Sequence, residues 1–192
     1  MDAISISVYH LLFITNLITK SFEGLGLYCN MTKEKNDFDN IIRENVTTNI
    51  LIRLCSLRDE YNRQFLKIED KKIDEFKYLC EPIWERIDKW TEIVQFRNNV
   101  LAHNLRDKKS NYKSVFLIKS FDQYDIPNTI KELIVLVECV KKFRQLLYDK
   151  FKSEYDFAQQ QMVLTNQNRV STKDIDYEKE INDLLLKLKE RE

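Results

Sequence analysis

Residues 73–104 read IDEFKYLCEPIWERIDKWTEIVQFRNNVLAHN, a stretch in which apolar side chains recur every three or four residues. This period predicts one long α-helix with an apolar face turned towards a core. A second, shorter stripe indicates that the helix is central in a bundle or lies at an interface. Pro82 is expected to kink this helix or to mark its start. The main stripe comprises Ile73, Phe76, Cys80, Ile83, Ile87, Trp90, Val94, Arg97 and Leu101, and the second comprises Ile93, Phe96, Val100 and His103.

The composition of the whole chain favours helices. Its 192 residues include two glycines and two prolines, whereas average usage is about 7% and about 5%. Sheet folds with many tight turns need glycine, so they are nearly excluded. Glycine-rich phosphate loops are excluded too, because Gly24 and Gly26 are the only close pair. With 43% hydrophobic and 32% charged residues, the sequence predicts a globular all-α protein.

Apolar stripes also place the other helices. Thr129 and Glu132 have the spacing of a capping box at the start of one of them. We predict a bundle of four to five helices over residues 1–163, with a long connection before its last helix, and a linker with an amphipathic helix over 164–192. The expected helices are 3–23, capped by Gly24 or Gly26; Asp37 to about Tyr61; Pro127 or Thr129 to about Met162; and Asp174 to the last residues.

The numbers of charged residues, cysteines and histidines further limit the kind of protein that this can be. Lys and Arg number 31, as do Asp and Glu, so any attraction to nucleic acid must come from a local patch. The four cysteines are far apart and indicate reduced core thiols in a cytoplasmic protein. Two histidines are too few for a histidine-rich metal site. We therefore expect no metal and no cofactor.

The N-terminal stretch from Ala3 to Thr19 is apolar and uncharged. It is short for a membrane span, which needs about 20 residues, and it lacks the basic start of a signal peptide. A buried first helix, with His10 as a core residue, is the preferred interpretation. Membrane association through this stretch is the weaker alternative.

Arg97 is the exception in the main stripe, since its neighbours in the stripe are apolar. An unpaired buried guanidinium is very costly, so Arg97 must have a partner or face a cleft. A purely structural interpretation pairs it with a buried carboxylate, for which Glu138 is a candidate. His103, six residues further on, could then simply stabilise a helix C-terminus. Trp84 and Trp90, on the same helix, are expected to pack in the core or an interface.

The segment Arg97-Asn98-Asn99-Val100-Leu101-Ala102-His103 resembles the motif of the HEPN superfamily. That motif is Arg, a polar residue that is often Asn, and His after four to six intervening residues, near the end of a long helix. The Ala before His103 is similar to abortive-infection-type members. The resemblance implies a helical fold over about residues 1–160 and a homodimer that cleaves RNA without metal. It implies catalytic roles for Arg97, Asn98 and His103, although the superfamily also includes silent scaffolds.

The chemistry of these residues suits metal-free RNA cleavage. Histidine titrates near about 6.5 and can take the 2′-OH proton or give one to the leaving 5′-oxygen. Arginine stays charged, and its guanidinium can bind two phosphate oxygens at once. In a straight helix, however, Arg97 and His103 lie about 120° apart with about 9 Å of rise. A bend at Asn98 and Asn99, or a second copy across a two-fold axis, is needed to bring them together.

The connection after the motif is basic and carries Tyr112 and Phe116 between its charges. Such a pattern suits a single-stranded nucleic acid, although a solvated loop gives the same pattern. Together with Asn99, its basic residues are the predicted substrate-binding group: Arg106, Lys108, Lys109 and Lys113.

The sequence thus supports two functional hypotheses. The first is a cytoplasmic ribonuclease of the toxin–antitoxin or phage-defence type, which acts on RNA as a homodimer and is restrained by an antitoxin or regulatory protein. The second is a non-catalytic helical module of the same fold that binds protein or RNA.

Overall fold

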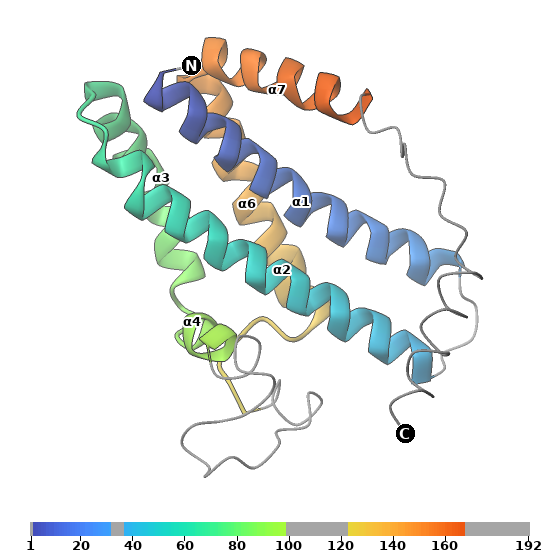
Figure 1. The fold of residues 1–192 in the computed structure, drawn as a ribbon. Coiled ribbons are helices and arrows are strands. Elements are labelled where there is room, and N and C mark those ends of the chain that lie inside the picture. Colours follow the sequence, from blue (N-terminus) through green and yellow to red (C-terminus); the bar gives the residue numbers. More distant parts are fainter. Residues whose placement is uncertain (1, 32–36, 99–122, 168–192) are drawn as a thin grey trace, which may run out of the picture. The chain divides into compact units, whose positions relative to one another are not determined.

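The computed structural model describes residues 2–31, 37–98 and 123–167, and these contain helices and no strand (Figure 1). The predicted all-α class is confirmed. Contacts divide the chain into two compact units, Met1–Gln160 and Gln161–Glu192, and the helical core lies in the first. The described elements are α1 (Ala3–Met31), α2 (Asp37–Arg63), the 3₁₀ turn η1 (Phe65–Lys67), α3 (Lys71–Ile87), α4 (Ile93–Phe96), α6 (Ile130–Lys150) and α7 (Lys152–Gln167).

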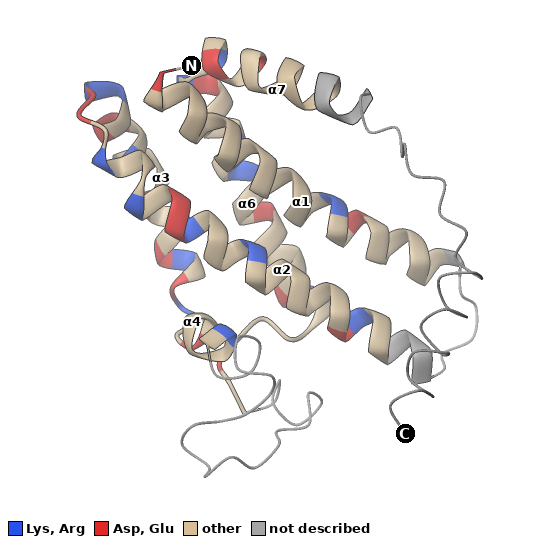
Figure 2. Cartoon of the chain, viewed as in Figure 1, with Lys and Arg blue, Asp and Glu red and all other residues tan. Residues whose placement is uncertain are grey.

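The first helix, α1, packs along α2 and α6 and lies antiparallel to α2 (Figure 1). Its core face includes Leu11 and Ile18, which are fully buried, as expected for a first helix in the core. By length and composition α1 is also apolar enough to cross a membrane, and 44% of its most apolar window is buried inside the fold. In Figure 2 the first half of α1 is coloured as neither acidic nor basic.

The predicted glycine cap of the first helix is wrong. Gly24 and Gly26 both lie inside α1, which continues to Met31. Neither glycine has an atom within 4 Å of the position that a Cβ would take. Leu25 between them is 3% exposed, so continued core packing offsets the low helix propensity of glycine, about 1 kcal/mol per residue.

The prediction of one helix over residues 73–101 is also wrong. Its first part, α3, passes through Pro82 without a break and ends at Ile87, and a turn leads into the short α4. The cause lies far along the chain. The backbone N–H groups of Thr91 and Glu92 bond to the side-chain and backbone oxygens of Asp125 instead of to a preceding helical turn.

The helix after residue 127 likewise ends earlier than predicted. It starts as expected, since Thr129 and Glu132 form a complete capping box at the start of α6. At Phe151 the backbone leaves the helical region, with φ −125° and ψ 47°, and α7 begins at the next residue. Phe151 is fully buried, so this break places a ring in the core.

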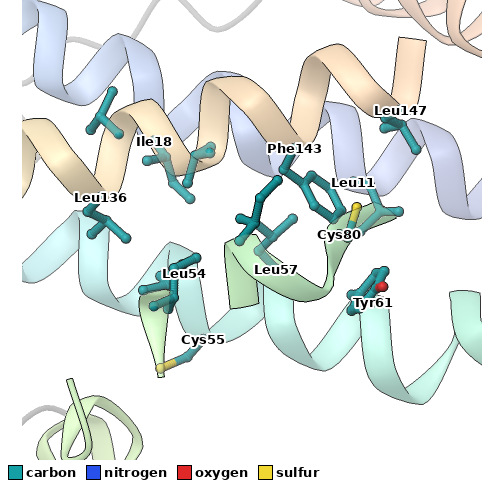
Figure 3. Packing of buried hydrophobic residues seen from close by; sticks show 14 of the residues in the cluster. Leu11, Ile18, Leu54, Cys55, Leu57, Tyr61, Cys80, Leu136, Phe143 and Leu147 are labelled. Carbon is teal, nitrogen blue, oxygen red and sulfur yellow. The ribbon is translucent and has the colours of Figure 1, made fainter. Parts of the chain in front are cut away.

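The core is built around aromatic rings from α2, η1, α3 and α6. Phe76 is fully buried and contacts four other rings, those of Tyr61, Phe65, Phe143 and Phe151. Figure 3 shows Phe143, Cys80, Leu57 and Leu11 filling the space between the helices.

The predicted packing roles of the tryptophans are confirmed. Trp90 is 6% exposed, and Trp84 is partly buried against the core, where it stacks on Tyr61. The prediction for the cysteines holds only in part. Cys55 and Cys80 are buried and Cys139 is half-buried, but Cys29 is exposed.

Candidate functional site

Arg97 stands where regular helix ends. α4 is a single turn, and the Arg97 N–H shares the carbonyl oxygens of Ile93 and Val94. At Arg97 and Asn98 the backbone is π-helical, which is a wider helical turn than that of an α-helix. Such wide turns are rare and often occur at functional sites. The bend expected at Asn98 and Asn99 to bring Arg97 and His103 together extends beyond the described residues and stays a prediction.

The Arg97 side chain is paired, with 28% of its surface exposed. Its Nη1 donates to Asp59 Oδ2 on α2 over 3.1 Å, and its Nε donates to Asn98 Oδ1 over 3.1 Å. The other oxygen of Asp59 lies 3.3 Å from Nε of Arg63. Asp59 thus holds two guanidinium groups at the surface of α2.

The proposed partner of Arg97 in the structural interpretation was wrong. Glu138 is exposed on α6 and pairs with Lys141 over 2.8 Å. The carboxylate that meets Arg97 comes from α2, because α4 packs against α2. Sequence reasoning missed Asp59, since nothing in its spacing separates it from the chain's other carboxylates. The only available signal was the requirement that Arg97 have a partner.

Arg97 also lies near the buried thiol of Cys55. Burial raises the pKa of Cys55, and the positive charges of Arg97 and Arg58 only partly oppose this. The thiol stays protonated at neutral pH, so it is a packing group and not a nucleophile.

Four hydrogen bonds join the turn before α4 to the chain just before α6. Asp125 Oδ2 accepts from both the N–H and the hydroxyl of Thr91, over 2.9 and 3.0 Å. The Glu92 N–H donates to the Asp125 carbonyl, and the Asp125 N–H donates to Glu92 Oε2. The rings of Phe96 and Tyr124 meet edge to face at 5.4 Å. Residues 33 apart in sequence are therefore fixed side by side, with Arg97 next to the junction.

Most of the predicted site lies outside the described residues. Of the predicted catalytic group, the structure describes Arg97 and Asn98 and brings them into contact. The basic connection up to residue 122 and the predicted C-terminal amphipathic helix also lie outside the described residues. The predicted site residues outside the described part are His103, Asn99, Arg106, Lys108, Lys109 and Lys113.

The other histidine, His10, is not the core residue that was predicted. Its side chain is 51% exposed, and its Nδ1 lies 3.6 Å from Glu60 Oε2. It lines a groove of about 460 Å³ between α1 and α2, together with Asp59 and Arg63. The face of α1 that carries His10 is turned to this groove, while the core face carries Leu11 and Leu12.

No group of three or more His, Cys, Asp or Glu side chains suited to a metal ion occurs among the described residues. Comparisons of the chain with protein-family models, with curated proteins and with solved structures find no match. The structure therefore establishes only that the protein is all-α. The functional proposal rests on the motif that begins at Arg97.

Proposed function

We propose that this protein is a metal-independent ribonuclease of the HEPN type, with a role in a toxin–antitoxin or phage-defence system. The observation that carries the proposal is the setting of Arg97. Its guanidinium lies at a widened turn, is partly exposed and is held by surface polar groups of Asp59 and Asn98. A guanidinium has five N–H donors, and these contacts use two of them.

In this proposal the reaction follows metal-free transesterification. His103 takes the proton of a ribose 2′-OH, whose oxygen attacks the adjacent phosphorus. The bond to the 5′-oxygen breaks, that oxygen receives from His103 the proton that the histidine has taken up, and a 2′,3′-cyclic phosphate remains. Arg97 stabilises the negative charge of the pentacoordinate phosphate, and Asn98 orients the Arg97 side chain through the contact with Nε.

The proposal also states the assembly in which the protein acts. A homodimer in the cytoplasm brings two copies of the motif together, RNA is the substrate, and an antitoxin or regulatory protein restrains the activity. Asn99 and the basic group Arg106, Lys108, Lys109 and Lys113 guide the RNA. In this proposal the reaction uses no metal and no cofactor, and the protein does not act at a membrane.

The test is cleavage of a mixed RNA by the purified full chain in EDTA, with analysis of the product ends. We expect 2′,3′-cyclic phosphate ends, and we expect Arg97→Ala and His103→Ala each to lower the rate at least about 100-fold, the usual scale for acid–base and charge-stabilising groups. Lys141→Ala is the control, because Lys141 pairs with exposed Glu138 on α6. Unchanged cleavage by His103→Ala contradicts the mechanism.

One observation favours the second candidate function, a non-catalytic binding module. Asp59 already pairs with Arg97, as in a structural ion pair. If a folded dimer cleaves no RNA, and RNA binding is the same for the wild type and Arg97→Ala, Arg97 has a structural role.

A further inference from the structure

A groove of about 550 Å³ runs between α2 and α3, and none of the residues that line it belongs to the proposed ribonuclease site. Its floor includes Tyr61, which is 3% exposed, and the half-buried Trp84. Tyr78 on its edge is 76% exposed. The volume falls within the range of about 300–1,000 Å³ typical of ligand pockets.

The walls of the groove are acidic. Asp74, Glu81, Glu85 and Asp88 line it, against Arg58 and Lys77. Arg58 is already paired with Asp88. Figure 2 marks acidic and basic positions along α2 and α3. In the described part of the chain, Glu81 and Glu85 form no ion pair, so the groove presents uncompensated negative charge.

The floor holds polar atoms that the described protein does not satisfy. Neither the Tyr61 hydroxyl nor the Trp84 Nε1–H has a hydrogen-bond partner among the described residues, and both are closed to solvent. Burial raises the pKa of Tyr61, the Cys80 thiol adds to this, and the neighbouring Trp84 N–H opposes it. Unsatisfied buried donors are rare in folded proteins and point to a missing partner.

The groove already shows one mode of recognising a cation. The guanidinium of Arg58 lies 5.6 Å from the centre of the Trp84 ring while it pairs with Asp88. Stacking on an aromatic ring combined with a carboxylate contact is the way in which proteins bind arginine side chains. Arg58 is 29% exposed and its partner Asp88 is 54% exposed. Ion pairs in such contact with water contribute little to stability, so displacement of Arg58 by another guanidinium has a small cost.

We propose that this groove docks a basic, arginine-containing segment of a partner protein. The basic side chains pair with Glu81 and Glu85 and stack on Tyr78. A backbone carbonyl of the segment accepts from the Trp84 N–H once Arg58 and Trp84 shift. RNA is disfavoured here, because its phosphates carry the same sign of charge as the groove. The proposal does not depend on ribonuclease activity.

The test titrates the full chain with a fluorescein-labelled hexa-arginine peptide and follows anisotropy and Trp fluorescence. We expect Glu81→Lys with Glu85→Lys to weaken binding at least ten-fold, and Tyr78→Ala to weaken it several-fold. The matched control is Glu23→Lys with Glu138→Lys, which changes the net charge equally at exposed positions on α1 and α6. Equal weakening by the control pair overturns the proposal, because it indicates general charge attraction.

A second variant separates binding from folding. Tyr61→Phe removes an unsatisfied hydroxyl, which in the proposal donates to the same backbone carbonyl of the segment as the Trp84 N–H. We therefore expect an unchanged or higher melting temperature together with weaker peptide binding. Unchanged binding by Tyr61→Phe overturns the role of the floor, whatever the melting temperature. A change of oligomeric state in the Glu81→Lys, Glu85→Lys variant without any loss of peptide binding also overturns the proposal, since the groove is then an interface between copies of this chain.

Discussion

Two regions that share helix α2 are held by different forces. Around Tyr61, rings from α2, η1, α3 and α6 pack edge to face or stacked. Tyr61, Phe65, Phe76 and Phe143 are almost completely closed to water. Around Asp59, two residues earlier, partly exposed ion pairs and hydrogen bonds hold α4 and Arg97. Ring burial supplies several kcal/mol per side chain, whereas exposed ion pairs supply about 0–1 kcal/mol. The ring cluster therefore fixes the fold, while the region around Arg97 can be rearranged at little cost.

The largest expected effect is in the ring cluster. Phe76→Ala removes contacts with four rings and should lower the free energy of unfolding by about 3–5 kcal/mol in urea titrations. Val94→Ala in α4 is the control, because Val94 is 37% exposed, and it should cost less than about 1 kcal/mol. Similar losses in the two variants would remove the contrast between the regions.

A smaller effect is expected at the junction beside Arg97. Asp125→Ala removes the acceptor of the Thr91 N–H and hydroxyl and should cost about 1 kcal/mol, the usual net contribution of such bonds. Hydrogen exchange at the Thr91 amide should become faster. Asp149→Ala, which removes an exposed contact with Gln145 on α6, should leave that amide unchanged. Unaltered exchange at Thr91 in Asp125→Ala would mean that the junction is held by other contacts.

The sequence predicted the class and the packing faces of this fold better than its breaks. The main stripe is buried from Ile73 to Trp90, and the second stripe is buried at Ile93 and Phe96, because both segments pack against the same core. Val94 of the main stripe is exposed. The turn itself depends on Asp125, 34 residues from Thr91, and local periodicity carries no information about so distant an acceptor.

The candidate site could be predicted only in part, for the same reason. Arg97 was recognisable because a guanidinium replaced an apolar side chain in a stripe. Its partner Asp59 was not, because the choice among carboxylates depends on which helix α4 packs against. His10 was assigned to the wrong face of α1, since an apolar helix has no polar stripe to show which side faces water.

The smallest effect concerns pH at the start of α6. Burial of Glu132 raises its pKa, but hydrogen bonds from Thr129 and Asn128 outweigh this and hold the pKa below the usual 4.5. A lowered pKa in the folded state adds stability above about pH 4.5, and this is lost as the pH falls through the folded-state pKa. Glu132→Gln should therefore be less stable than the wild type near neutral pH and equal to it in acid. A constant difference in unfolding free energy across this range would contradict the assignment.

The most direct test of the central claim, that Arg97 serves function and not folding, is Arg97→Lys in one preparation assayed for both properties. Lysine keeps the charge beside Asp59 but lacks the planar fork that binds two phosphate oxygens. The account predicts that the free energy of unfolding changes by less than about 1 kcal/mol, as for an exposed ion pair, while RNA cleavage in EDTA falls at least about ten-fold. Unchanged cleavage with a marked loss of stability would contradict it and make Arg97 a structural residue.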